Sequence, residues 1–149
     1  DYILLYMLRP MPELLSFAKM VAQSRGLKLL YIGDFDYDDA DIESCHDVGV
    51  EDFLNAIYSA RYVITNSFHA TVFSTIFKKK FCSYAVSRTG TRVIDFLDDF
   101  NLQECRIDDL NRTDYSFNQE IDWDDISSII NRKKQESLKY IRSIVNQDK

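Results

Sequence analysis

The sequence predicts an α/β fold, in which parallel strands alternate with helices around one core. The clearest evidence is segment 61–81, where an apolar β-branched run, a polar turn, a helical apolar period and a second apolar run follow one another. A second succession of this kind occupies residues 3–32 and is punctuated by Pro12 and Gly26. The chain has 149 residues, of which 46% are hydrophobic, so we expect residues 1–149 to form a single domain around one ordinary core.

The chain is expected to begin with a strand, a helix and a second strand. Residues 3–8 form an apolar run, and Pro12 suits the first turn of a helix that continues to Arg25. Gly26 is typical of a helix end, and residues 27–32 are apolar enough for the next strand.

An acidic loop and a second succession of elements follow. Residues 33–41 have no apolar period and are expected to form a loop. The apolar residues of the next helix have helical spacing and are Val50, Phe53, Leu54 and Ile57. Residues 61–65, 68–77 and 81–86 then predict a strand, a helix and a strand, which implies a right-handed parallel connection.

The last third of the chain is predicted to be helical at both ends. A helix is expected near 91–100, an irregular connector over 101–121, and a final helix that Asp122 caps. The polar face of that helix is rich in basic residues, namely Lys133, Lys134, Lys139 and Arg142. Together the elements predict a Rossmann-like parallel sheet with helices on both faces and with the C-terminal helix of residues 121–149 packed on it.

Composition excludes several classes of protein. A net charge of −6 spread through the chain argues against a nucleic-acid partner, because nucleic-acid-binding proteins usually present a clustered basic face. Cys45, Cys82 and Cys105 form no CxxC pair, which favours reduced thiols in a cytoplasmic protein. The sequence has neither a run of about 18 apolar residues nor a signal peptide, so we expect no membrane span. The abrupt start, with Asp1 directly before a strand-like run, favours a fragment of a longer protein.

Position relative to the strands separates the candidate site residues. Residues that directly follow a parallel strand lie at the carboxyl edge of the sheet, where α/β proteins bind ligands. Arg9, the Asp34 loop, residues 66–69 and Arg88 all follow predicted strands, whereas the lysines of segment 78–80 precede one. We therefore expect the first group at the ligand edge and the lysines at the opposite edge, as the basic end of a helix.

His69 is the strongest candidate for chemistry. Val72, Phe73 and Ile76 follow it at helical spacing, which predicts that its imidazole lies on the stripe that faces the sheet. One interpretation is a buried structural histidine bonded to a carbonyl. The other is a functional site, because the N–H groups at a helix start attract an anion and would bring it beside a proton carrier.

Arginines and acids offer two further hypotheses. Arg88 and Arg92 flank a stretch with hydroxyls and Gly90, which suits a carboxylate or phosphate, although surface ion pairs are the alternative. The acidic residues after the second strand would suit a divalent ion, but their spacing is common in solvated loops; they are Asp34, Asp36, Asp38 and Asp39. His46 is expected to be an ordinary loop residue, and we predict no metal site.

Three segments in order resemble the C-terminal half of the polysaccharide pyruvyl transferase family. They are GVEDFLNAIYSARYVITNSFHATVFSTIFKKKF, TRVIDFLDDFNLQECRI and IDWDDISSIINRKKQESLKYIRSIV, which together cover nearly the whole chain. The most specific element is TNSFHA after a strand, which is similar to the family block T-[DN]-S-F-H-[GA]. The resemblance implies two Rossmann-type domains facing across a cleft, as in GT-B glycosyltransferases, with residues 1–149 as the second domain.

The resemblance also implies an activity, namely ketal pyruvylation of a sugar in a bacterial surface polysaccharide precursor. The donor substrate would be phosphoenolpyruvate, no cofactor would be needed, and the partners would be a lipid-linked saccharide acceptor and the missing N-terminal domain. Such an enzyme would work in the cytoplasm or at the inner face of the membrane. The isolated chain is expected to be inactive, because a cleft enzyme needs both walls.

Site roles follow from the motif. His69 would be the general acid/base, Asn66 and Ser67 would donate hydrogen bonds to the donor anion, and Arg88, Arg92 or Arg9 would neutralise it. Some relatives have an arginine two residues before the histidine, where this sequence has Ser67. Ala70 replaces the commoner glycine, a small change.

Two other functions remain open from the sequence. A GT-B glycosyltransferase domain would bind a nucleotide sugar, although no ribose-binding acid stands in the expected place. A non-catalytic flavodoxin-like or receiver-like module would explain the acidic loop and would use Mg²⁺ or phosphoryl chemistry at Asp34 or Asp36.

Overall fold

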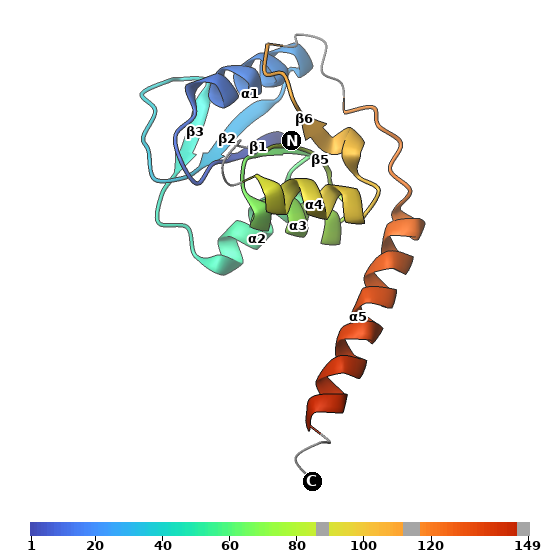
Figure 1. Cartoon of the computed structure of the whole chain (residues 1–149). Helices are drawn as coiled ribbons and strands as arrows, with labels where there is room; N and C mark the ends of the chain where they lie inside the picture. Colours follow the sequence, from blue (N-terminus) through green and yellow to red (C-terminus); the bar gives the residue numbers. More distant parts are fainter. Residues whose placement is uncertain (86–89, 112–116, 146–149) are drawn as a thin grey trace. The chain divides into compact units, whose positions relative to one another are not determined.

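The computed structural model covers the whole chain and describes residues 1–85, 90–111 and 117–145. Two compact units make up the chain, Asp1–Gln119 and Glu120–Lys149. The elements of the first unit, labelled in Figure 1, are β1 (Tyr2–Tyr6), α1 (Pro12–Arg25), β2 (Lys28–Ile32), β3 (Ile42–Cys45), α2 (Val50–Ser59), β4 (Tyr62–Thr65), α3 (Phe68–Ile76), β5 (Lys80–Tyr84), α4 (Thr91–Asp99), a 3-10 turn (Gln103–Cys105) and β6 (Arg106–Ile107). The second unit contains α5 (Trp123–Val145).

The first unit is built on one six-stranded sheet in the order β3-β2-β1-β4-β5-β6. Every neighbouring pair of these strands is parallel. In Figure 1, α1 covers one face of the sheet, and α2, α3 and α4 cover the other. Because both faces are covered, three successive residues of the central strand β1 (Ile3, Leu4 and Leu5) are completely buried. The prediction of a Rossmann-like α/β fold with a parallel sheet is confirmed.

Helix α1 begins and ends where the sequence predicts. Pro12 occupies its first turn, and Gly26 ends it in the left-handed conformation at φ 61°. The N–H of Leu27 donates to the carbonyl of Ala22 at 3.0 Å, which closes the helix end. The buried face of the helix meets the sheet through Leu14, Phe17, Ala18, Val21 and Ala22.

The two edge strands were not predicted from the sequence. In β3 only Ile42 is buried, and β6 has two residues, of which Ile107 is buried. Each pairs with a single neighbour, β2 and β5 respectively. The expected irregular connector over 101–121 is therefore wrong, since it contains a 3-10 turn and a strand. Such short segments carry no readable period, and only the partner strand determines that they are extended.

Phe117 completes the core on the α1 face. It is 1% exposed, and its ring stacks on that of Tyr62 with the centroids 4.4 Å apart. Lys80 Nζ donates to its carbonyl at 3.0 Å. This lysine and Lys79, whose Nζ donates to the carbonyl of Tyr58 at 2.6 Å, are thus bonded to the main chain rather than only to solvent. Burial lowers the pKa of Lys79.

The second unit consists mainly of α5. Asp122 Oδ1 accepts the N–H groups of Asp124 and Asp125 at 3.1 and 3.0 Å, which confirms the predicted cap. Several large apolar side chains in the last turns of the helix are exposed, namely Tyr140, Ile141, Ile144 and Val145. None of the helices in the described part of the chain combines the length and apolar character of a membrane-spanning helix.

Candidate active site

The carboxyl ends of β1 and β4 mark the place where the connections of the sheet change direction. From β1 the chain continues to β2 on one side, and from β4 it continues to β5 on the other. The two strands are paired so that Tyr6 lies opposite Thr65 at their carboxyl ends. In open parallel sheets, ligands bind in the crevice outside such a point. The segments that follow β1 and β4 therefore form the candidate site.

Hydrogen bonds tie the segment after β4 to β1. The Thr65 hydroxyl donates to the carbonyl of Tyr6 at 2.8 Å and accepts the N–H of Ser67 at 2.9 Å. Asn66 Oδ1 accepts the N–H of Leu8 at 3.3 Å. Asn66, a predicted ligand-binding residue, thus uses its oxygen to hold the two segments together, and only its Nδ2 group can donate to a ligand.

The start of α3 presents donors without helical partners. The first bond of the helix runs from the N–H of Thr71 to the carbonyl of Ser67 at 3.1 Å, so the N–H groups of Phe68, His69 and Ala70 precede it. Ser67 is the N-cap residue and is fully buried, but its side chain makes no capping bond. Within the described residues its Oγ has no hydrogen-bond partner. A ligand oxygen that accepted this hydroxyl proton would remove the cost of leaving it unpaired.

His69 lies at the surface, and the prediction that it faces the sheet is wrong. The residues of α3 that are buried are Ala70, Thr71, Ser74 and Thr75. The apolar stripe that follows His69 is instead the outer face of the helix, where Phe73 lies against Phe53 of α2 with the ring centroids 6.2 Å apart. The inner face could not be recognised from apolar spacing because it contains hydroxyl residues. Thr71 and Thr75 donate to the carbonyls of Ser67 and Thr71, so burying their hydroxyls costs little free energy.

The aromatic ring of Phe68 connects the starts of α3 and α4. Its centroid lies 5.9 Å from that of Phe96 in an edge-to-face arrangement. The Arg92 guanidinium carbon lies 5.4 Å from the same ring centroid, and the His69 ring centroid lies 6.0 Å from it. The structure therefore brings two of the predicted site residues, Arg92 and His69, to one aromatic side chain.

Of the two other predicted arginines, Arg9 belongs to the described residues and Arg88 does not. Arg9 is exposed and follows Leu8, whose N–H is bonded to Asn66, so it lies in the segment after β1 at the same edge. Arg88 lies outside the described residues.

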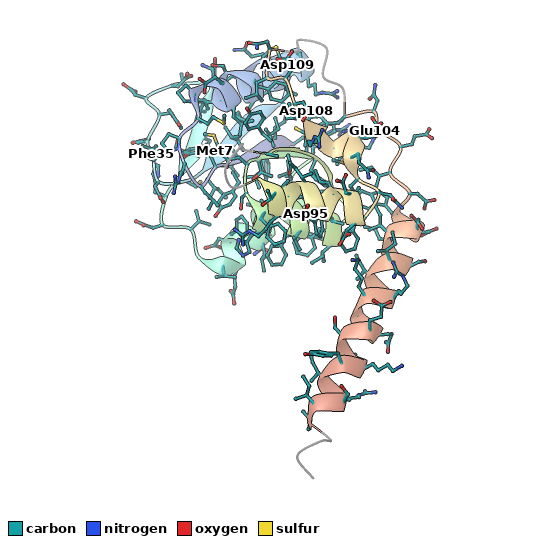
Figure 2. All side chains as sticks on the ribbon, in the orientation of Figure 1. Met7, Phe35, Asp95, Glu104, Asp108 and Asp109 are labelled. Carbon is teal, nitrogen blue, oxygen red and sulfur yellow. The ribbon has the colours of Figure 1, made fainter. Side chains whose placement is uncertain are left out.

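A cavity of about 190 Å³ opens at the same edge, on the side of β1, β2 and β3. Its lining residues are Tyr6, Met7, Leu8, Ile32, Gly33, Asp34, Cys45, Asp47 and Val48. Figure 2 labels Met7, which is buried directly after β1, and Phe35, which lies in the loop after β2 and is 46% exposed. Burial, followed by the nearby charge of Asp34, raises the pKa of Tyr6. Sequence reasoning missed Tyr6 and Asp47, since one belongs to a strand and the other follows the unpredicted β3.

The acidic loop and His46 form a separate arrangement at this edge. His46 Nδ1 lies 2.9 Å from the carbonyl oxygen of Gly33, and its Nε2 lies 3.6 Å from Asp36 Oδ1. The histidine thus holds the loop after β2 to the end of β3. In the described residues, His, Cys, Asp and Glu side chains nowhere gather in a group of three or more that would hold a metal ion.

A second cavity, of about 570 Å³, lies at the opposite edge of the sheet. It is lined by the end of α1 and the first residues of β2 and β3. None of the predicted site residues lines it. Volume alone therefore does not locate the candidate site.

The fold defines the class of the protein, a Rossmann-like α/β domain with its candidate site at the carboxyl edge of the sheet. Residues 1–88 match the family described as "Polysaccharide pyruvyl transferase", and the chain belongs to this family. The matched region includes the whole TNSFHA block at the start of α3.

The chain was also compared with solved structures and with curated proteins. Among solved structures, the chain is similar to Methanocaldococcus jannaschii UDP-GlcNAc 2-epimerase in complex with UDP-GlcNAc and UDP, with 13% identity and a TM-score of 0.48. The similarity covers 91% of this chain and 45% of that one, so the chain spans less than half the length of that protein. The comparison with curated proteins gives no match.

Proposed function

We propose that residues 1–149 are the C-terminal half of a two-domain transferase that places a pyruvyl ketal on a saccharide. Phosphoenolpyruvate is the donor, and the acceptor is a lipid-linked precursor of a bacterial surface polysaccharide. The reaction takes place in the cytoplasm at the inner face of the membrane. Membership of the polysaccharide pyruvyl transferase family supports the general activity, and the start of α3 supports the choice of an anionic donor.

The reaction makes definite chemical demands. The methylene carbon of phosphoenolpyruvate gains a proton and becomes a methyl group, and two acceptor hydroxyl oxygens bond to the adjacent carbon. The bond from that carbon to the phosphate oxygen breaks, and inorganic phosphate leaves. Of the two protons that the acceptor hydroxyls lose, one corresponds to the proton gained by the methylene carbon, and the other leaves with the phosphate. The site therefore needs a group that moves protons and donors that hold a carboxylate and a phosphate.

The observation that carries the proposal is the set of donors at the start of α3. The N–H groups of Phe68, His69 and Ala70 precede the first helical bond, and the helix dipole adds positive potential at this end. The buried Ser67 hydroxyl has no partner among the described residues. An anionic group of the donor would accept hydrogen bonds from these groups. Arg92, which lies over Phe68, supplies the cation that the motif lacks at Ser67.

His69 is our candidate for the general acid/base. Its side chain is exposed and has no hydrogen-bond partner within the described ranges, where its ring contact is with Phe68, so a substrate can reach it. It occupies the first turn of the same helix that would hold the anion. The imidazole would take a proton from an acceptor hydroxyl and deliver one to the donor methylene carbon.

The test uses the complete protein and follows the transfer of the pyruvyl group. The acceptor is the saccharide fraction of cells from which the gene has been deleted, and the donor is radiolabelled phosphoenolpyruvate. We expect equal amounts of acid-labile label in the saccharide and of released phosphate. His69→Ala should lower kcat by about 10²- to 10⁴-fold. His46→Ala is the matched control, since this histidine only holds a loop, and it should stay within about twofold of the wild type.

Two results would contradict the proposal. If the wild-type protein transfers no label and instead binds nucleoside diphosphates more tightly than phosphoenolpyruvate, the glycosyltransferase alternative is favoured. If a folded His69→Ala variant keeps the wild-type rate, the role of His69 is wrong even though the activity stands.

A further inference from the structure

Thr65 occupies a buried position between β1 and the start of α3. It is the last residue of β4, is 0% exposed and lies opposite Tyr6 in the sheet. Its hydroxyl uses both of its capacities, because it donates to the Tyr6 carbonyl at 2.8 Å and accepts the Ser67 N–H at 2.9 Å. One hydroxyl group therefore joins the main chain of the central strand to the N-cap residue of the helix.

The effect of this bridge is to fix Ser67 from both sides. Its N–H is bonded to Thr65, and its carbonyl accepts the N–H and the hydroxyl of Thr71 at 3.1 and 2.8 Å. Among the polar groups of Ser67, the Oγ is the one that has no partner in the described part of the chain. A donor group that is held in place before the ligand arrives loses little freedom on binding, which is how sites gain affinity for an anion.

A second hydrogen bond joins the segment after β4 to the segment after β1. Asn66, directly after Thr65, accepts the N–H of Leu8 at 3.3 Å. The segments that leave β1 and β4 in different directions are thus held at a fixed separation. Both belong to the crevice at which ligands bind in such sheets.

We propose that Thr65 is a positioning residue, whose hydroxyl holds the Ser67 donor and the following N–H groups in the arrangement that binds the donor anion. This inference rests on the proposed function for the identity of the anion, which is the phosphate or carboxylate of phosphoenolpyruvate. Thr65 itself does not touch the reacting atoms, since both bonds of its hydroxyl are made within the protein.

Substitutions of Thr65 can distinguish the effect of its hydroxyl from the effect of its side-chain volume. Thr65→Val keeps the shape but leaves the Tyr6 carbonyl and the Ser67 N–H unpaired in a buried place. Thr65→Ser keeps the hydroxyl and loses only a methyl group. Thr75→Val is the matched control, because Thr75 is also buried in this layer and donates to a carbonyl of α3 at 3.0 Å, but it lies at the far end of the helix.

The experiment measures kcat, the KM for phosphoenolpyruvate and thermal stability of the complete protein with each substitution. Both valine variants should lose stability, but only Thr65→Val should raise the KM, by about tenfold or more, and Thr65→Ser should restore most of it. If Thr65→Val does not fold, Thr65→Ala takes its place, since it removes the hydroxyl without adding a methyl group. Equal KM values in folded Thr65→Val and Thr75→Val would overturn the inference.

A binding measurement distinguishes this inference from the proposed function. If the wild-type protein does not turn over phosphoenolpyruvate, inorganic phosphate becomes the probe in calorimetric titration. Phosphate binding that Thr65→Val weakens and Thr75→Val leaves unchanged would support the positioning role and reject the proposed donor. Phosphate binding that is absent, or that both variants change equally, would reject the positioning role as well.

Discussion

The two halves of the carboxyl edge differ in the residues that begin their helices. Helices α1 and α2, beside β1, β2 and β3, have acidic residues in the first turn, namely Glu13, Glu51 and Asp52. Helices α3 and α4, on the side of β4 and β5, have none there and begin near His69 and Arg92. The first half also contributes Asp34 and Asp47 to its cavity.

A helix start at the ligand edge is therefore not by itself an anion site. A carboxylate in the first turn already satisfies the positive end of the helix dipole. In α1, Pro12 also removes one N–H group, and the cap residue Met11 has no hydroxyl. In α3 the first N–H groups precede the first helical bond, and the Ser67 hydroxyl has no partner among the described residues, so both are available to the proposed ligand. Residue chemistry in the first turn, more than topology, therefore makes the start of α3 the candidate anion site.

The largest expected effect comes from giving α3 the start that α1 has. His69→Glu places a carboxylate in the first turn and should weaken the binding of phosphoenolpyruvate by about 100-fold or more, because two like charges about 4 Å apart near a protein surface repel each other by about 4 kcal/mol. Calorimetric titration of the complete protein measures this. Glu13→Gln at the equivalent place in α1 should leave the affinity unchanged. Equal affinities of His69→Glu and the wild type would remove the anion from α3.

A middle-sized effect is expected from Ser67→Ala. This change deletes a buried hydroxyl without a described partner, so the ligand-free protein should become more stable by about 1 kcal/mol, while the KM for phosphoenolpyruvate should rise about tenfold. Ser74→Ala removes a second buried hydroxyl of α3 that has no partner in the described residues, at the other end of the helix. Ser74→Ala should therefore raise the stability without changing the KM for phosphoenolpyruvate. Chemical unfolding and initial-rate kinetics together separate the two variants, and a shared rise in KM would contradict the assignment.

The smallest effect is expected from the ion pair that attaches α1 to the acidic loop. Lys19 Nζ donates to Asp39, which lowers the pKa of that carboxyl below its ordinary value. Because the pKa of Asp39 is lower in the folded protein than in the unfolded protein, the ion pair stabilises the fold at pH values above the unfolded pKa of about 4. This stabilisation is lost as the pH falls through the folded pKa. Asp39→Asn should therefore lower the urea midpoint slightly at pH 7 and not at pH 2.

The same variant also tests the choice of α3, because α1 contributes no group to the proposed anion site. The KM for phosphoenolpyruvate should be the same in Asp39→Asn and the wild type. Asp95→Asn, at an exposed position of α4 labelled in Figure 2, is the charge-matched control for the unfolding measurement. Equal pH dependence of the urea midpoint in the two variants would show that the Lys19 ion pair contributes nothing measurable.

Much of the fold could be predicted because its signals are local. The boundaries of α1 follow from Pro12 and Gly26, and the start of α5 follows from Asp122, since these residues act on the backbone next to them. The edge strands β3 and β6 could not be predicted. They are short and mostly polar, and what makes them strands is a neighbour that lies elsewhere in the sequence.

The sequence correctly placed the motif at the carboxyl edge of the sheet, but it did not predict how the side chains of the motif are arranged there. The TNSFHA block does follow a buried strand and begin a helix. The orientation of His69 was wrong, because apolar periodicity cannot recognise a helix face made of alanine and hydroxyl residues that bond to their own backbone.

By itself, then, the sequence determined the alternation of strands and helices, the ends of α1, the cap of α5 and the place of the motif after β4. Only the tertiary structure decided which face of α3 meets the sheet, which strands close its edges, and how Thr65 and Asn66 hold the site. The physical reason is the distance along the chain. Thr65 bonds to a residue 59 positions away and Asn66 to one 58 positions away, and no local preference of the backbone encodes such contacts.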